Sequence, residues 1–211
     1  MPAQPPHRIR IKICGITSVA DAQLAATAGA DAIGLVFYGP SPRAVTIEQA
    51  REIAYSVGPF VTLVGLFVDA EQDFIEQVLA RVPLHLLQFH GSESQQFCEL
   101  FQRPYMKAIR MRPELDLQQA IAGHPNAVAI LLDAYRPGVP GGTGETFDWQ
   151  RIPTNSALPL VLAGGLTPEN IALAVSSTSV YGVDVSGGVE SSPGKKNGEK
   201  IRAFIDNARR A

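Results

Sequence analysis

Cys14 is the side chain in this sequence best placed to act as a base or a nucleophile. It closes the apolar run 9–14, and a glycine follows it at once. In an extended strand Lys12 and Cys14 share one face, because side chains alternate with a period of two. A thiol beside a cation ionises more readily, which suits acid–base chemistry. The alternative is a small buried side chain that closes a core strand, which is the commoner use of a free cysteine, and this segment alone favours that alternative.

Polar side chains also end several other apolar runs. They are Gln88, His90, Arg110, Asp133, Asp184 and Ser186. Parallel strands buried on both faces are apolar throughout, so polar residues at their ends need a separate explanation. We expect one pocket to gather them. His90 could instead be a hydrogen-bonded core histidine, and Asp133 could be either an acid catalyst or a cap for loop amides.

Two glycine-bearing segments, 163–166 and 186–189, follow the last two apolar runs. The first precedes Thr167 and a proline, which predicts a helix with Thr167 at its N-cap. Glycine lets backbone N–H groups approach a phosphate closely, and a helix N-terminus adds a favourable dipole. Glycine pairs also serve ordinary tight turns, but two at corresponding places favour a phosphate site. The predicted phosphate-binding residues are Gly164, Gly165, Ser186, Gly187 and Gly188.

Arg43 follows Pro40-Ser-Pro, in the loop after the second apolar run. A surface arginine is usually only solvated. The stiff proline-bearing approach could instead aim the guanidinium inward, where it would suit a substrate carboxylate. Both interpretations stay open from the residues alone.

Eight apolar runs with strand character recur along the chain, each followed by a stretch with helical spacing. The predicted strands are 9–14, 32–37, 61–68, 84–89, 105–110, 128–132, 159–163 and 181–185. The predicted helices are 18–29, 46–57, 71–81, 92–103, 115–122, 148–152, 168–176 and 198–209. Strict alternation implies parallel strands with crossover helices, and eight repeats predict a closed (βα)8 TIM barrel with outer helices. A doubly wound open sheet is the alternative.

Closure of a barrel would place the last strand beside the first. Asp184 would then lie within reach of Lys12, and a buried lysine needs such a partner. We therefore expect a buried ion pair below the site. The strand ends and their following loops form the face of a barrel that carries the active site.

The chain of 211 residues shows no composition shift or linker that would mark a domain boundary. We expect residues 1–8 to be a flexible leader and 9–211 to form a single domain. The longest irregular segment is 134–146, and loops of that length are often functional. Apolar helix faces could serve a core or an interface, so monomer and homodimer both stay open.

Composition excludes several classes of partner. The formal net charge is -2, with both signs scattered along the chain, so we expect no nucleic-acid binding. No apolar stretch is long enough to span a bilayer and no signal peptide is evident, which predicts a cytoplasmic protein without membrane contact. Cys14 and Cys98 are expected to be reduced, with Cys98 packed in a helix. The four dispersed histidines lack zinc-ligand spacing, so no metal is expected.

Motifs over nearly the whole chain resemble those of the phosphoribosylanthranilate isomerase family, in the same order. They are Lys12-Ile-Cys-Gly-Ile-Thr17, Asp31-Ala-Ile-Gly-Leu-Val-Phe37, Ser41-Pro-Arg43, Leu87-Gln-Phe-His-Gly91, Leu132-Asp133, Gly141-Gly-Thr-Gly144 with Phe147-Asp-Trp149, Leu162-Ala-Gly-Gly-Leu-Thr-Pro-Glu-Asn170 and Gly182-Val-Asp-Val-Ser186. The first and the last two motifs are specific in combination. Two details depart from the family pattern: Asn197 stands where aspartate is usual, and Gly187 replaces a serine that could contact phosphate.

This resemblance implies a (βα)8 barrel that performs an Amadori rearrangement in tryptophan biosynthesis, with no cofactor. It implies Cys14 as general base and Asp133 as general acid. Arg43 would bind the anthranilate carboxylate of a small phosphoribosyl substrate. Further substrate-binding candidates are His90, Asp184 and the glycine-bearing residues named above.

The sequence also allows functions other than this isomerase. A flavin-dependent barrel could hold the phosphate of FMN on the same two loops. A cysteine hydrolase is less well supported, because no residues complete a triad with Cys14. A phosphosugar-binding protein without catalysis would tolerate loss of Cys14. A second phosphoribosyl substrate would need the same ring opening, although the usual acid pair for that reaction is two aspartates.

Overall fold

The computed structural model describes residues 8–135 and 146–211. The predicted leader therefore falls almost wholly outside the described residues, as does most of the 134–146 loop. Within them, the strands are β1 (Arg10–Cys14), β2 (Ala32–Val36), β3 (Thr62–Phe67), β4 (Leu86–Phe89), β5 (Tyr105–Arg110), β6 (Ala129–Asp133), β7 (Leu160–Leu162) and β8 (Gly182–Val185), followed by β9 (Glu190–Ser192) and β10 (Lys195–Lys196).

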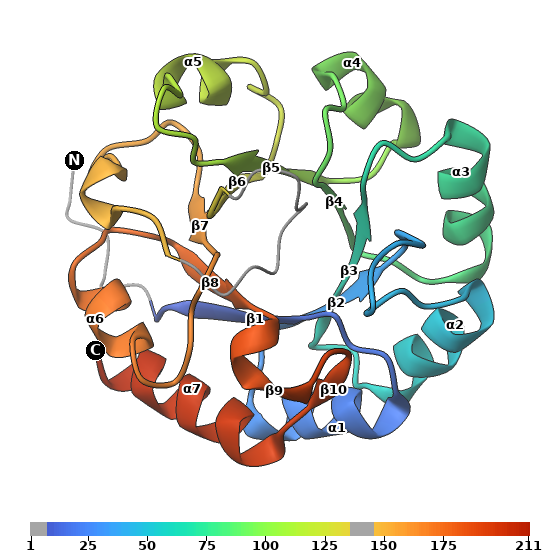
Figure 1. Ribbon diagram of the computed structural model, residues 1–211. Helices are drawn as coiled ribbons and strands as arrows, with labels where there is room; N and C mark the ends of the chain where they lie inside the picture. The colour runs from blue at the N-terminus through green and yellow to red at the C-terminus, as the bar shows by residue number, and fades with distance from the viewer. Residues whose placement is uncertain (1–7, 136–145) are drawn as a thin grey trace.

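The first eight strands form a closed parallel barrel in sequence order, ringed by helices (Figure 1). The helices are α1 (Val19–Ala28), α2 (Ile47–Ser56), α3 (Gln72–Arg81), α4 (Gln95–Cys98), α5 (Leu117–Ala122), α6 (Ile171–Ser176) and α7 (Gly198–Arg210), with 3₁₀ turns η1 (Glu99–Phe101), η2 (Trp149–Arg151) and η3 (Gly187–Val189). The barrel prediction is confirmed and the open-sheet alternative is wrong, because β8 pairs with β1 and leaves no edge.

Side chains of each strand alternate between two apolar environments. Outward side chains such as Ile11 and Ile13 pack with the helices in the large core. Inward side chains form smaller clusters, made of Met106, Ala108, Ala129, Leu131, Val161 and Ala163, and of Cys14, Val36 and Leu66. The strands are therefore buried on both faces, as expected of a parallel barrel.

Side-chain caps fix where several helices begin. Ser18, Ser94 and Asp116 each accept a hydrogen bond from a backbone N–H in the first turn, and Thr46 forms a full capping box. Asn197 caps α7 through the N–H groups of residues 199 and 200. Asparagine at this position therefore keeps the capping role that an aspartate would have.

Three predicted helices differ from those observed, and one of them, 148–152, contains only the 3₁₀ turn η2. The stretch 92–103 contains only α4 and η1. The 3₁₀ turn η1 ends with Gln102 at its C-cap, whose φ of 49° lies in the left-handed region. Helix α6 has Asn170 at its N-cap, so the predicted cap at Thr167 is wrong. The Asn170 side chain accepts a hydrogen bond from the Thr167 backbone N–H and donates one to the carbonyl of residue 165, which ties residues 167–170 into a turn before the helix.

Among residues 8–135 and 146–211, no helix is long and apolar enough to cross a membrane.

Candidate active site

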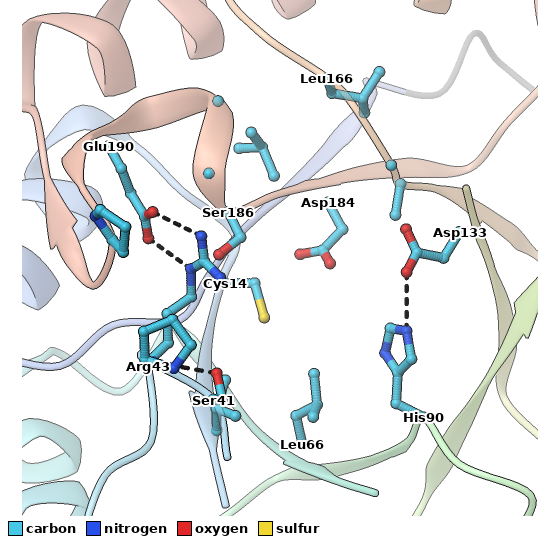
Figure 2. Close-up of a pocket in the computed structure, with 18 of the residues that line it drawn as sticks. Cys14, Ser41, Arg43, Leu66, His90, Asp133, Leu166, Asp184, Ser186 and Glu190 are labelled. Atoms are coloured by element: carbon cyan, nitrogen blue, oxygen red, sulfur yellow. Dashed lines mark hydrogen bonds and ion pairs between the residues drawn. The ribbon is translucent and has the colours of Figure 1, made fainter. Parts of the chain in front are cut away.

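A cavity of about 540 Å³ opens at the carboxyl ends of the barrel strands. All ten candidate site residues line it: Cys14, Arg43, His90, Asp133, Gly164, Gly165, Asp184, Ser186, Gly187 and Gly188. Figure 2 shows Cys14 on one side of the cavity and the His90–Asp133 pair on the other. The expectation that one pocket gathers the polar residues at the strand ends is confirmed for Gln88, His90, Asp133, Asp184 and Ser186, but Arg110 does not line the cavity. The structure thereby places a thiol and a carboxyl group at opposite sides of one space.

Cys14 ends β1 with its side chain inside the barrel, 5% exposed. Its neighbour on β2 is Gly34, where an added Cβ would lie 2.7 Å from the Cys14 Sγ and 3.0 Å from the Lys12 Nζ. A side chain at position 34 would therefore displace both groups. Burial raises the pKa of the Cys14 thiol above its ordinary value, and the nearby Lys12 ammonium works in the opposite direction.

Lys12 and Asp184 form the ion pair that the sequence predicts. The Lys12 Nζ lies 2.8 Å from Asp184 Oδ1, and both side chains are less than one-tenth exposed. Burial alone would lower the pKa of Lys12, but Asp184 and Cys14 outweigh it and raise the pKa to about 12. A fixed positive charge therefore lies beside the thiol throughout the neutral pH range.

Replacing Lys12 by methionine is expected to lower the free energy of unfolding by about 3 kcal/mol, because the Asp184 carboxylate is then buried without its cation. Urea denaturation followed by circular dichroism measures the change. Adding Asp184→Asn removes the stranded charge, so the double variant should recover part of the loss. Simple addition of the two single losses would contradict the pairing.

The raised pKa of Cys14 makes its alkylation a direct probe of the thiolate. Iodoacetamide should modify Cys14 slowly at pH 7, and the rate should rise with pH to a midpoint above the ordinary thiol value, because only the thiolate reacts. Peptide mass spectrometry separates Cys14 from Cys98, whose pKa burial raises to about 12. Lys12→Met should move the midpoint still higher, whereas an unchanged midpoint would remove Lys12 from the control of this thiol.

Asp133 ends β6 and is held by a short chain of buried side chains. His90 Nε2 lies 3.0 Å from Asp133 Oδ2, and the Gln88 amide nitrogen lies 3.0 Å from His90 Nδ1. Because the amide donates to Nδ1, the ring proton lies on Nε2 and is donated to Asp133. The interaction leaves the other Asp133 oxygen available to a proton or a ligand. His90 therefore serves Asp133 in addition to lining the cavity.

The loop that carries His90 is fixed by a second buried ion pair. Lys107 Nζ lies 2.8 Å from Glu93 Oε2 and donates to the Gly91 carbonyl at 2.7 Å. Glu93 also accepts a hydrogen bond from the Asp69 backbone N–H. These contacts join β5 to the loops after β3 and β4, which limits movement of the imidazole.

Arg43 points into the protein and is held by a carboxylate, so the solvated-surface interpretation is wrong. Its Nε and Nη2 atoms each lie 2.8 Å from one oxygen of Glu190. The Glu190 carboxylate also lies 2.8 Å from Lys196 Nζ. Burial alone would raise the pKa of Glu190, but Arg43 and Lys196 hold it below its usual value. Glu190 lines the cavity and Lys196 contacts Glu190 from behind, and the sequence analysis identified neither residue.

The glycine-bearing segments form the wall of the cavity near Ser186. Gly164 and Gly165 have φ values of 80° and 63°, which favour glycine, and a Cβ on Gly188 would lie 1.9 Å from the Leu166 carbonyl oxygen. Within the described part of the chain, no residue accepts a hydrogen bond from the backbone N–H of Gly164, Gly165, Gly187 or Gly188. Free backbone donors gathered at one cavity wall suit a phosphate group.

No group of three or more His, Cys, Asp or Glu side chains that could hold a metal occurs among the described residues.

The sequence of this chain is similar to those of known proteins. The sequence model of the family described as N-(5'phosphoribosyl)anthranilate (PRA) isomerase matches residues 11–207. A protein from Cellvibrio japonicus named N-(5'-phosphoribosyl)anthranilate isomerase is 68% identical over 203 residues, which are 96% of this chain and 94% of the relative.

Solved structures give the same result. The phosphoribosyl anthranilate isomerase of Thermotoga maritima has a TM-score of 0.89 at 40% identity, covering 96% of this chain and 100% of its own. A structure described as phosphoribosyl anthranilate isomerase in complex with reduced 1-(o-carboxyphenylamino)-1-deoxyribulose 5-phosphate has a TM-score of 0.85 at 39% identity, with coverage of 96% and 100%.

Proposed function

This chain belongs to the N-(5'-phosphoribosyl)anthranilate isomerase family, and on that premise we propose that Cys14 and Asp133 supply its base and its acid. The reaction is the Amadori rearrangement of N-(5'-phosphoribosyl)anthranilate to 1-(2-carboxyphenylamino)-1-deoxyribulose 5-phosphate, a step of tryptophan biosynthesis. The observation that carries the assignment is the placement of the two groups on opposite sides of one cavity.

Asp133 opens the ribose ring in the first step. In its protonated form it donates a proton to the ring oxygen while the C1′–O bond breaks, and the nitrogen lone pair forms an iminium at C1′. The carboxylate left on Asp133 is stabilised by the hydrogen bond from His90 Nε2. The neutral tautomer fixed by Gln88 makes His90 a donor toward this carboxylate.

Cys14 completes the rearrangement from the other side. Its thiolate removes the proton from C2′, and the electron pair of that C–H bond forms the C1′–C2′ double bond and neutralises the iminium. The resulting enol gives the ketone when its hydroxyl proton is lost and C1′ is protonated. Lys12 and the positive charge of the iminium both favour the thiolate and so act against the effect of burial on the thiol.

The two ends of the substrate would bind on the remaining walls of the cavity. We assign the phosphate to the backbone N–H groups of the glycine-bearing segments, where Gly187 in place of serine removes one possible side-chain contact. We assign the anthranilate carboxylate to Arg43. Because the chain belongs to this family, we prefer the isomerase to the flavin-dependent barrel, the cysteine hydrolase and the non-catalytic phosphosugar-binding protein. Because the substrate is a phosphorylated intermediate and both cysteines are free, we place the protein in the cytoplasm.

The direct test is turnover by the purified protein. N-(5'-phosphoribosyl)anthranilate made in situ should be consumed, which is followed by the loss of its anthranilate fluorescence. Inorganic phosphate at millimolar concentration should compete if the glycine-bearing segments hold the phosphate. A folded wild-type protein without turnover would overturn the assignment.

A further inference from the structure

Three charged side chains form a buried cluster at one wall of the cavity: Arg43, Glu190 and Lys196. The Arg43 side chain is 15% exposed and that of Glu190 is 5% exposed. Lys196 is completely buried, and its Nζ also donates to the Ser186 carbonyl at 3.2 Å. The cluster joins the loop after β2 to η3 and the β9–β10 hairpin, and nothing in the acid–base chemistry above uses Glu190 or Lys196.

The geometry of the guanidinium leaves one of its edges for a ligand. Glu190 binds side-on, taking the Nε–H and one N–H of Nη2. The end of the guanidinium still carries the second N–H of Nη2 and both N–H groups of Nη1. Within the described ranges, no other residue accepts a hydrogen bond from the Arg43 side chain. That free edge can bind a second carboxylate through two parallel hydrogen bonds.

Lys196 neutralises the charge of Glu190, which allows Arg43 to bind a second carboxylate. Two carboxylates on one guanidinium would repel each other if nothing else neutralised the first. Lys196 Nζ lies 2.8 Å from Glu190 Oε1 and cancels its charge. Arg43 therefore keeps a net positive charge for the ligand, while Glu190 fixes the plane in which the guanidinium lies.

The position of Arg43 is also tightly constrained by its surroundings. A Cβ at position 15 would lie 2.5 Å from the Arg43 Cδ, so the aliphatic part of the side chain passes directly over the backbone next to Cys14. A Cβ on Gly187 would lie 3.3 Å from Nη2. Figure 2 shows the guanidinium between Ser186, Glu190 and Cys14. A change in its orientation would therefore move any carboxylate relative to the thiol.

We propose that Glu190, neutralised by Lys196, is a positioning residue that orients Arg43 and thereby sets the preference for an aryl group carrying a carboxylate. Glu190 acts through Arg43 and takes no part in proton transfer. This proposal rests on the proposed function, because it concerns the carboxylate end of the same substrate.

Two ligands that differ only in the carboxylate test the proposal. They are reduced 1-(2-carboxyphenylamino)-1-deoxyribulose 5-phosphate and its phenylamino counterpart, and calorimetry gives their dissociation constants. The wild type should bind the carboxylated ligand at least about tenfold more tightly, as a charge-assisted bidentate pair predicts. In Glu190→Gln this preference should fall by at least about fivefold, while binding of the phenylamino ligand changes little. The matched control is Glu199→Gln, an exposed residue of α7, which should behave as the wild type.

A variant of Lys196 tests whether the charge of Glu190 must be neutralised. Lys196→Met leaves the Glu190 charge uncancelled, so it should weaken binding of the carboxylated ligand. Adding Glu190→Gln should restore part of that loss, because it removes the uncancelled charge. An unchanged carboxylate preference in a folded Glu190→Gln protein would overturn the proposal. Failure of the wild type to bind either ligand would instead overturn the proposed function.

Discussion

Replacement of Cys14 by serine is expected to lower kcat by at least about a hundredfold, within the range of general acid–base catalysis. Serine fits the space beside Gly34, so the fold and the cavity should persist. Its hydroxyl, however, ionises far less readily than a thiol and cannot take the C2′ proton at neutral pH. Steady-state fluorescence of anthranilate measures kcat and KM, and KM should change little because the phosphate and carboxylate sites are intact.

The other cysteine provides the matched control. Cys98 ends α4 and is completely buried away from the cavity lining. Cys98→Ser should keep kcat within about twofold of the wild type, with a loss of stability from burying a hydroxyl. If Cys14→Ser kept a similar rate, the thiol would have no part in proton transfer and another base would have to be sought.

The barrel could be predicted because its signal is distributed along the chain. Apolar runs of strand length alternate with helical spacing eight times, and each repeat independently supports the same architecture. The pairing of Lys12 with Asp184 follows from parity together with closure, since Lys12 lies two residues before Cys14 and Asp184 lies two residues before Ser186. The register places these two residues opposite each other on β1 and β8. Because all eight repeats support the barrel, an error in one helix boundary does not change the predicted fold.

The cluster around Glu190 could not be predicted by the same means. It lies on a three-residue strand that directly follows a 3₁₀ turn, and segments this short have no measurable periodicity. Its partners, Arg43 and Lys196, come from a loop and from a two-residue strand. Their meeting depends on how two loops fold over the barrel, which is a tertiary property. The error at Thr167 has a similar cause, because the Asn170 side chain folds back on the turn.

Asp133→Asn is the variant that tests the acid, and we expect it to lower kcat by about 10²–10⁴-fold. The asparagine amide has the shape of the carboxyl group, and its oxygen can still accept the hydrogen bond from His90 Nε2. It has no acidic proton to give to the ring oxygen, so the C1′–O bond must break without protonation. The dissociation constant for the reduced product should stay within a few-fold of the wild type, since that ligand needs no proton transfer.

An exposed carboxylate separates this effect from a general loss of charge. Asp206 lies on the outer face of α7, and Asp206→Asn should keep the wild-type rate. A His90→Gln variant adds a further discrimination: it removes the imidazole donor but leaves Asp133 able to carry a proton, so its loss in kcat should be smaller. A larger loss in His90→Gln than in Asp133→Asn would assign the acid to His90. The order of the two losses therefore decides which member of the pair protonates the substrate.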